Sequence, residues 1–121
     1  MAKILVIEDT PANRALATKL LQAAGHDVLS AETATDGMAL ARTELPDLVL
    51  MDLGLPDMDG WQALRELRAE QGAVATLRIV AFTAHAMVGD DDRARAAGFD
   101  EYLSKPIDYA TFADTIQGLL P

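Results

Sequence analysis

The sequence predicts an α/β domain of the doubly wound type, in which five helices cover the two faces of a five-stranded parallel sheet. Five short apolar runs alternate along the chain with stretches whose apolar residues recur at helical spacing. Each parallel connection needs a crossover, and the spacing of the runs leaves room for a helical one every time. The 121 residues fit one domain, which we expect to span residues 1–121.

The composition excludes some kinds of binding partner and some kinds of metal site. Half of the residues are hydrophobic and 5% are aromatic, which suits an aliphatic core, and the chain has no cysteine for disulfides or thiolate metal sites. The formal net charge of -9 repels phosphate backbones and anionic lipid, so neither nucleic acid nor a membrane is an expected partner. No apolar run is long enough for a signal-peptide core or a membrane span, and we expect a cytoplasmic protein.

Residues 3–7 form the first predicted strand, a run that is apolar from its second residue onward. The run ends at two acids, Glu8 and Asp9. Thr10 then offers an N-cap oxygen, and a proline directly after it favours a helix over 11–24 with leucine and alanine on one face. The first strand therefore carries two carboxylates to its carboxyl end.

The second and third strands have different places in the expected sheet. Residues 27–31 form a shorter strand at the sheet edge, and we expect no site residue from it. Thr35 can cap the following helix, which ends before Pro46. Residues 48–51 are a continuous apolar strand, buried on both faces, that stops at Asp52. Ligands bind at the carboxyl ends of parallel strands, so Asp52 is a candidate for chemistry.

A loop rich in glycine and proline follows Asp52. Asp57 and Asp59 are expected to serve this loop and the N-terminus of the next helix, without binding metal. That helix contains Trp61 as a large apolar contact and ends in a polar connection around residues 70–72.

The second half of the chain repeats strand and helix twice. We expect these elements at residues 78–82, within 84–98, at 101–104 and at 112–119. The helix within 84–98 has few large apolar residues and an acidic start at Asp90, whose charge suits a helix N-terminus. The two strands are followed by Thr83 and by Lys105.

Polar residues follow four strands that are neighbours in a sheet of order 2-1-3-4-5. These residues would meet at one edge of the sheet: Glu8, Asp9, Asp52, Thr83 and Lys105. Three acids so close together repel one another unless a cation lies among them. Mg²⁺ prefers oxygen ligands and commonly combines a few carboxylates with a substrate phosphate, so we expect Mg²⁺ as the cofactor.

With these residues in place, the whole chain resembles a receiver domain of the two-component response regulators, which have a flavodoxin-like fold. The resemblance rests on five motifs in order: Glu8-Asp9, Asp52, Thr83-Ala84, Tyr102 and Lys105-Pro106. The stretch from Ala84 to Ile107 further resembles single-domain regulators of the DivK kind and receivers attached to hybrid histidine kinases. A free-standing regulator, a phosphorelay intermediate and a part of a hybrid kinase all fit the sequence.

The resemblance implies a metal site with named ligands. Asp9 and Asp52 would bind Mg²⁺ directly, Glu8 through water, and the backbone carbonyl of Gly54 would be a further ligand. Glu8 is one methylene longer than aspartate, the commonest family residue, so direct coordination by Glu8 stays open. Gly54 leaves the space beside Asp52 unhindered, and the phosphorylated form is therefore expected not to be unusually long-lived.

The resemblance also implies a phosphorylation-activated switch rather than an enzyme acting on other molecules. Asp52 would accept a phosphoryl group from a sensor histidine kinase or a histidine phosphotransfer protein, and Lys105 and Thr83 would bind that group. Thr83 would then shift toward it and Tyr102 would turn into the vacated space. The changed surface of the fourth helix, fifth strand and fifth helix would be read by a downstream protein target. A cis peptide bond before Pro106 would aim the lysine inward.

Other functions remain to be weighed against the switch. A Mg²⁺-dependent phosphohydrolase would also form a phosphoaspartate, but it usually has a second aspartate two residues after the nucleophile, where this chain has Gly54. A receiver-like binding module that takes no phosphate would lack a metal acid, Thr83 or Lys105, and all are present. No glycine-rich phosphate loop follows the first strand, and His26 and His85 have no partners at metal-ligand spacing.

Overall fold

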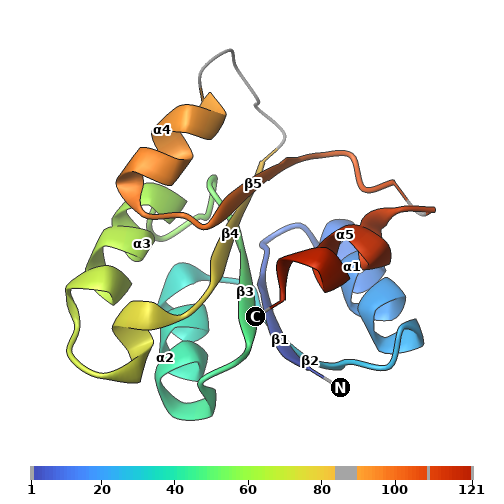
Figure 1. Ribbon diagram of the computed structural model, residues 1–121, viewed down its shortest axis with the longest axis horizontal. Coiled ribbons are helices and arrows are strands. Elements are labelled where there is room, and N and C mark those ends of the chain that lie inside the picture. Colours follow the sequence, from blue (N-terminus) through green and yellow to red (C-terminus); the bar gives the residue numbers. More distant parts are fainter. Residues whose placement is uncertain (1, 84–89, 109, 121) are drawn as a thin grey trace.

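A computed structural model describes residues 2–83, 90–108 and 110–120. These residues form a five-stranded parallel sheet in the order β2-β1-β3-β4-β5, with helices on both faces (Figure 1). The strands are β1 (Lys3–Ile7), β2 (Asp27–Ala31), β3 (Leu48–Asp52), β4 (Ile79–Thr83) and β5 (Glu101–Ser104). The helices are α1 (Pro11–Ala23), α2 (Ala34–Glu44), α3 (Gly60–Ala69), α4 (Asp90–Ala97), α5 (Phe112–Leu119) and the 3-10 helix η1 (Ala73–Thr76). The predicted doubly wound fold and its strand order are confirmed.

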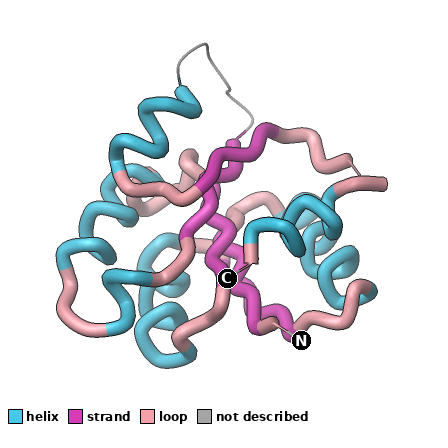
Figure 2. Tube along the Cα trace, viewed as in Figure 1, coloured by secondary structure: helices cyan, strands magenta, loops and turns pink. Residues whose placement is uncertain are grey.

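Two apolar cores, one on each face of the sheet, hold the helices in place. Figure 1 shows α2, α3 and α4 on one side and α1 and α5 on the other, and Figure 2 shows the strands running between them. Leu64 and Leu67 of α3 belong to the same buried cluster as Met51 of β3. Leu21 of α1 and Ile116 of α5 belong to the cluster on the opposite face. All residues of β3 and β4 are buried, as their continuous apolar runs predict for central strands.

The N-terminus of α2 differs from the sequence prediction. Thr33, and not Thr35, is the N-cap residue, and its side chain accepts a hydrogen bond from the backbone N–H of Asp36. Thr35 lies in the first helical turn, and its hydroxyl donates to the carboxylate of Asp57. The sequence has two threonines at this end of the helix, Thr33 and Thr35. Thr35 does not cap the helix because it bonds to Asp57 instead. Thr10 is the N-cap residue of α1, as predicted, but its side chain makes no capping hydrogen bond.

The connection after α3 contains the short helix η1, which the sequence pattern did not predict. It follows Gly72, whose φ of 85° lies in the left-handed region that favours glycine. The guanidinium of Arg68 in α3 donates hydrogen bonds to the carbonyl oxygens of Ala75, Leu77 and Gly98. One half-buried cation therefore ties η1 and the segment after α4 to α3, a long-range contact that local periodicity does not reveal.

The helix expected within 84–98 is present as α4, and it begins at the acidic residue Asp90. Residues 84–89, and His85 with them, lie outside the described residues. Ala94 of α4 and Phe99 after it are buried in the same core as α3. In the described ranges, no helix combines the length and the apolar composition that a membrane crossing requires.

Candidate functional site

Four neighbouring strands end at one edge of the sheet and deliver the predicted site residues there. Asp52 is the last residue of β3 and Thr83 the last of β4, whereas Glu8 directly follows β1 and Lys105 directly follows β5. The register sets Asp52 beside Phe82, the residue before Thr83. Because the strands are parallel, residues far apart in the sequence lie together at their carboxyl ends.

Three carboxylates face one another at this edge. One side-chain oxygen of each of Glu8, Asp9 and Asp52 lies within 4.8 Å of the other two. Glu8 is only 1% exposed and Asp52 only 7%, while Asp9 is half-buried. The set consists of oxygen donors alone, which is the chemistry that a hard divalent cation such as Mg²⁺ requires.

Lys105 supplies the positive charge of the site. Its Nζ atom donates a hydrogen bond to Oε1 of Glu8 at 2.6 Å and lies 3.4 Å from Oδ2 of Asp52. The lysine side chain is 9% exposed, so these ion pairs are largely shielded from water. The same Nζ atom lies 5.1 Å from the ring centroid of Phe82, which adds a cation–π contact. A buried ammonium thus offsets part of the negative charge.

The carboxyl groups of the site have shifted pKa values. Burial, followed by the nearness of Asp52, raises the pKa of Glu8 to about 7, against the opposing effect of Lys105. Burial alone would also raise the pKa of Asp52, but Glu8, the N–H of Gly54 and the charge of Lys105 outweigh it and lower that pKa. Without a metal, Glu8 therefore takes up a proton as the pH falls below about 7, while Asp52 stays ionised.

The buried oxygen Oε2 of Glu8 has no hydrogen-bond partner. A buried carboxylate oxygen left without a partner is costly, and it points to a group that the protein alone does not provide. A divalent cation among the carboxylates would satisfy this oxygen and displace the proton of Glu8. The residues present therefore fit Mg²⁺.

The loop after β3 holds the Asp52 carboxylate from its other side. The backbone N–H of Gly54 donates to Oδ1 of Asp52 at 3.0 Å, and the N–H of Gly60 donates to the carbonyl oxygen of Leu53 at 2.9 Å. A Cβ atom at Gly60 would lie 2.7 Å from the backbone oxygen of Asp52, so only glycine fits there. Close packing at both ends of the loop thus keeps Asp52 in place.

Thr83, Tyr102 and Pro106 lie on the β4 and β5 side of the site. Thr83 is buried and pairs in register with Ser104, and its carbonyl oxygen accepts a hydrogen bond from the backbone N–H of Lys105 at 2.8 Å. Tyr102 is half-buried and packs against the core that contains α3. The peptide bond between Lys105 and Pro106 is cis.

Comparison with known proteins places this arrangement in a family. Residues 4–117 match the model of the response regulator receiver domain. The chain belongs to the response regulator receiver family. Receiver domains of two-component response regulators serve phosphorylation-dependent signalling, and the resemblance found in the sequence is thereby confirmed.

Individual relatives cover almost the whole receiver domain. The chain is 38% identical to Protein PilH of Pseudomonas aeruginosa over 120 residues, which is 99% of this chain and 98% of the relative. It is 33% identical over 117 residues to the polar-differentiation response regulator DivK of Brucella ovis, covering 97% of this chain and 94% of that protein. The structure of the chemotaxis response regulator CheY4 of Vibrio cholerae superimposes with a TM-score of 0.90 at 27% identity, with 99% of each chain covered.

Arg14 is a residue of this receiver site that the sequence interpretation missed. Its guanidinium, on α1, donates a hydrogen bond to the backbone carbonyl of Glu8 at 2.9 Å and pairs with Glu32 at 3.3 Å. The arginine therefore fixes the backbone at Glu8, directly before Asp9. A basic residue one helical turn after the N-cap was the only signal for it in the sequence.

Asp57 and Asp59 of the loop serve two different helices. Asp59 is the N-cap residue of α3, as predicted, and accepts a hydrogen bond from the N–H of Gln62 at 2.8 Å. The prediction for Asp57 is wrong in part, because its carboxylate reaches the N-terminus of α2 instead of α3. It accepts hydrogen bonds from the N–H groups of Ala34 and Thr35 at 2.8 and 2.9 Å. These bonds, with the hydroxyl of Thr35 foremost, lower the pKa of Asp57 to about 2.

His26 and Trp61 take part in packing away from the carboxylates. His26 is buried, and its Nδ1 atom accepts a hydrogen bond from the backbone N–H of Ala2 at 3.2 Å. Trp61 is half-buried, with its ring edge-to-face against Phe99 at 5.5 Å and under the guanidinium of Arg93 at 4.6 Å. The predicted packing role of Trp61 is confirmed.

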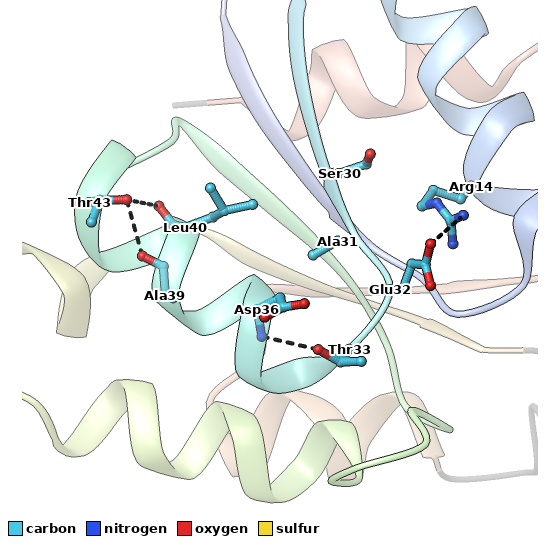
Figure 3. Close-up of a pocket in the computed structure, with 9 residues that line it drawn as sticks. All are labelled: Arg14, Ser30, Ala31, Glu32, Thr33, Asp36, Ala39, Leu40 and Thr43. Atoms are coloured by element: carbon cyan, nitrogen blue, oxygen red, sulfur yellow. Dashed lines mark hydrogen bonds and ion pairs between the residues drawn. The ribbon is translucent and has the colours of Figure 1, made fainter.

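A cavity of about 730 Å³ lies apart from the acidic site, along the end of β2 and the outer side of α2 (Figure 3). Glu32, Thr33 and Asp36 line it on one side, Leu40 and Thr43 on another. Glu8, Asp9, Asp52 and Lys105 do not line this cavity. Arg14, which bonds the backbone carbonyl of Glu8, also lines it, so the cavity adjoins the acidic site through this arginine.

Proposed function

We propose that residues 1–121 form one receiver domain in which Asp52 accepts a phosphoryl group from a phosphohistidine. The donor is a sensor histidine kinase or a histidine phosphotransfer protein. The observation that carries this proposal is the contact of one ammonium, that of Lys105, with the carboxylates of both Glu8 and Asp52 at 2.6 and 3.4 Å. A cation and acids gathered around one ionised carboxylate are what phosphoryl transfer to that carboxylate needs.

The reaction exchanges one phosphorus bond for another. An oxygen of the Asp52 carboxylate attacks the phosphorus atom, an O–P bond forms, the N–P bond of the phosphohistidine breaks, and the imidazole leaves with its electron pair. The low pKa of Asp52 keeps this oxygen ionised and ready to attack. The switch is reset by hydrolysis: water attacks the same phosphorus, the bond between phosphorus and the Asp52 oxygen breaks, and inorganic phosphate leaves. This restores the Asp52 carboxylate.

The cofactor of this proposal is Mg²⁺, held by Asp9, Asp52, the backbone carbonyl of Gly54 and Glu8, either directly or through water. Bound there, it neutralises charge on the phosphoryl oxygens. The fit is supported by the carboxylate oxygens within 4.8 Å of one another and by the orphaned Oε2 atom of Glu8.

Lys105 and Thr83 bind the phosphoryl group once it is on Asp52. The ammonium of Lys105 pairs with a phosphoryl oxygen, and the hydroxyl of Thr83 donates to another. Thr83 is buried at 4% exposure, so its movement toward the phosphoryl group opens space that the neighbouring Tyr102 fills. The resulting change of the α4, β5 and α5 surface alters binding of a downstream protein target.

The domain is a switch and not an enzyme that acts on other molecules, and it works in the cytoplasm. It catalyses only its own phosphorylation and dephosphorylation. The alternative of a phosphohydrolase is disfavoured by Gly54, which provides no general acid two residues after Asp52. A module that never binds phosphate is disfavoured because the metal acids, Thr83 and Lys105 are all present.

The proposal is tested by mass spectrometry of the intact protein. Incubation with phosphoramidate and Mg²⁺, a small donor with the same P–N bond as phosphohistidine, should add one phosphoryl group that hydroxylamine removes. Omission of Mg²⁺, or the substitution Asp52→Asn, should abolish the adduct. Asp59→Asn is the matched control, because it neutralises an aspartate of the same loop that only caps α3. An adduct of unchanged yield in Asp52→Asn would refute the proposal.

A further inference from the structure

Asp57 joins the loop that follows β3 to a helix that supplies nothing to the acidic site. Its Oδ1 atom accepts the N–H of Ala34 at 2.8 Å, and its Oδ2 atom accepts the N–H of Thr35 at 2.9 Å. The hydroxyl of Thr35 donates to the same Oδ2 atom at 2.6 Å. Three hydrogen bonds thus hold one side chain of the site loop against the first turn of α2, where the helix dipole also favours a carboxylate.

The first turn of α2 does not depend on Asp57 for its own cap. Thr33 is the N-cap residue and already accepts the N–H of Asp36 at 3.1 Å. Asp57 accepts from the two earlier N–H groups, and water can take its place at the exposed N–H of Thr35 but not readily at that of the buried Ala34. The bonds to Asp57 therefore restrain the loop that bears it as well as this helix turn.

α2 is a firm support because it packs tightly on β1. The Cα of Gly37 faces Ile7 so closely that an added Cβ would lie 2.4 Å from the Cδ1 atom of Ile7. Ile7 is the last residue of β1 and directly precedes the metal acid Glu8. Asp57 therefore ties the loop that contains Gly54 to α2. This helix packs on β1, and Glu8 directly follows β1.

We propose that Asp57 is a positioning residue of the site: its anchor on α2 holds the loop so that Gly54 stays bonded to Asp52 and faces the acids of β1. This inference rests on the proposed function, because that function is what makes the position of Gly54 relative to the acids important. Without the anchor, the loop between the buried Leu55 and Asp59, which caps α3, loses the three hydrogen bonds that Asp57 makes to α2. The Gly54 N–H then leaves Oδ1 of Asp52 more often, and the metal site loses a fixed carbonyl.

The first test measures hydrogen exchange of the Gly54 amide by NMR in the metal-free protein. Asp57→Ala should speed exchange at Gly54 by about tenfold, relative to amides of β3. Asp36→Ala is the matched control, because it removes the same charge near the same helix end without touching the loop. Its side chain makes no hydrogen bond among the contacts described, and exchange at Gly54 should stay as in the wild type. Equal exchange at Gly54 in the two variants would overturn the inference.

The second test measures Mg²⁺ affinity by titration calorimetry. Asp57→Ala should weaken binding about tenfold, as loss of support behind a ligand commonly does, and Asp36→Ala should weaken it far less. If the two variants lose affinity equally, the effect is one of net charge and the positioning role fails. If the wild type does not bind Mg²⁺, the proposed function fails, while exchange at Gly54 still decides the role of Asp57.

Thr35→Val provides a milder variant in case Asp57→Ala does not fold. It removes the hydroxyl that donates to Asp57 and keeps the two backbone donors. Exchange at Gly54 should rise by a smaller factor, about twofold to threefold. In the double variant with Asp57→Ala, Thr35→Val should add nothing further, and independent additive effects would contradict the shared anchor.

Discussion

The ammonium of Lys105 lies 2.6 Å from a carboxylate oxygen of Glu8, although 97 positions separate the two residues in the sequence. Glu8 follows β1 and Lys105 follows β5, so this contact spans the sheet across β3 and β4. The same ammonium lies 3.4 Å from Asp52. One lysine therefore links the acid with the raised pKa to the acid that we propose as phosphoacceptor.

Replacing Lys105 by methionine should slow phosphorylation of Asp52. The methionine keeps the apolar stem of the lysine but removes the buried positive charge, which would stabilise the phosphoryl oxygens during transfer. Loss of one such charged donor typically costs on the order of 100-fold in rate. The rate of adduct formation with phosphoramidate and Mg²⁺, followed by intact mass, measures the effect.

Lys19→Met is the control for the Lys105 variant, since Lys19 lies exposed on α1. It removes the same charge from the protein and should leave the rate of adduct formation at the wild-type value. Equal rates in Lys105→Met and Lys19→Met would remove Lys105 from the chemistry.

In the absence of metal, the protein should lose stability as the pH rises from 4.5 to 7. The pKa of Glu8 is 4.5 in its ordinary state and about 7 in the folded protein, so the folded state binds more protons than the unfolded state in this window. Stability then falls with rising pH, by up to about 3 kcal/mol, and levels off above pH 7. Urea unfolding in EDTA across this range measures the free energy of unfolding.

Glu8→Gln should flatten this pH dependence, because glutamine has a similar shape and cannot ionise. Mg²⁺ should stabilise the wild type more at pH 8 than at pH 5, since at low pH the cation must displace the proton of Glu8. A wild-type stability that rises steadily from pH 4.5 to 7 in EDTA, in parallel with Glu8→Gln, would contradict a raised pKa at Glu8.

Much of the fold and the gathering of the site could be predicted because both follow from local pattern. The apolar runs ending at Asp52 and before Glu8 identify buried parallel strands, and parallel strands place their carboxyl ends together. Trp61 and Asp59 were interpreted well for the same reason, since helix spacing and N-caps depend on near neighbours. The strand order itself separates the site strands from β2.

Contacts between elements could not be predicted from local pattern. Asp57 looks from the sequence like a second acid for the N-terminus of α3, and only the packed structure brings it to Thr35, 22 positions earlier. Arg14 reads as one exposed residue of an amphipathic helix, yet it bonds the backbone of Glu8. The raised pKa of Glu8 likewise depends on burial beside Asp52, which has no counterpart in the sequence pattern.

Gly54→Asn should prolong the phosphorylated state. Among the described residues, an added Cβ at position 54 would have only Oδ1 of Asp52 within 4 Å, at 3.9 Å, so a side chain fits there and lies beside the phosphoryl group. It would hinder the water that attacks phosphorus, and we expect the phosphoryl group to be lost several-fold more slowly than from the wild type. The half-life of the adduct after removal of the donor measures this.

Gly54→Ala separates steric hindrance from a mere change of backbone freedom, because its side chain is too short to cover the phosphoryl group. Its half-life should lie close to that of the wild type. A wild-type adduct that outlasts the Gly54→Asn adduct would contradict the expectation that Gly54 leaves the attacking water unhindered.

Gly60→Ala should damage both the fold and the site. Its Cβ would lie 2.7 Å from the backbone oxygen of Asp52 and 2.8 Å from the Cα of Leu53, and backbone atoms cannot turn aside as a side chain would. Such overpacking costs about 2 kcal/mol in the free energy of unfolding, and the forced shift of Asp52 should also slow its phosphorylation. Gly118→Ala in α5 is the matched control, because nothing lies within 4 Å of its added Cβ, and it should stabilise the protein by about 0.5 kcal/mol through helix propensity. If urea unfolding gave Gly60→Ala and Gly118→Ala the same stability, with equal phosphorylation rates, the close packing of Gly60 on Asp52 would have no part in holding the site.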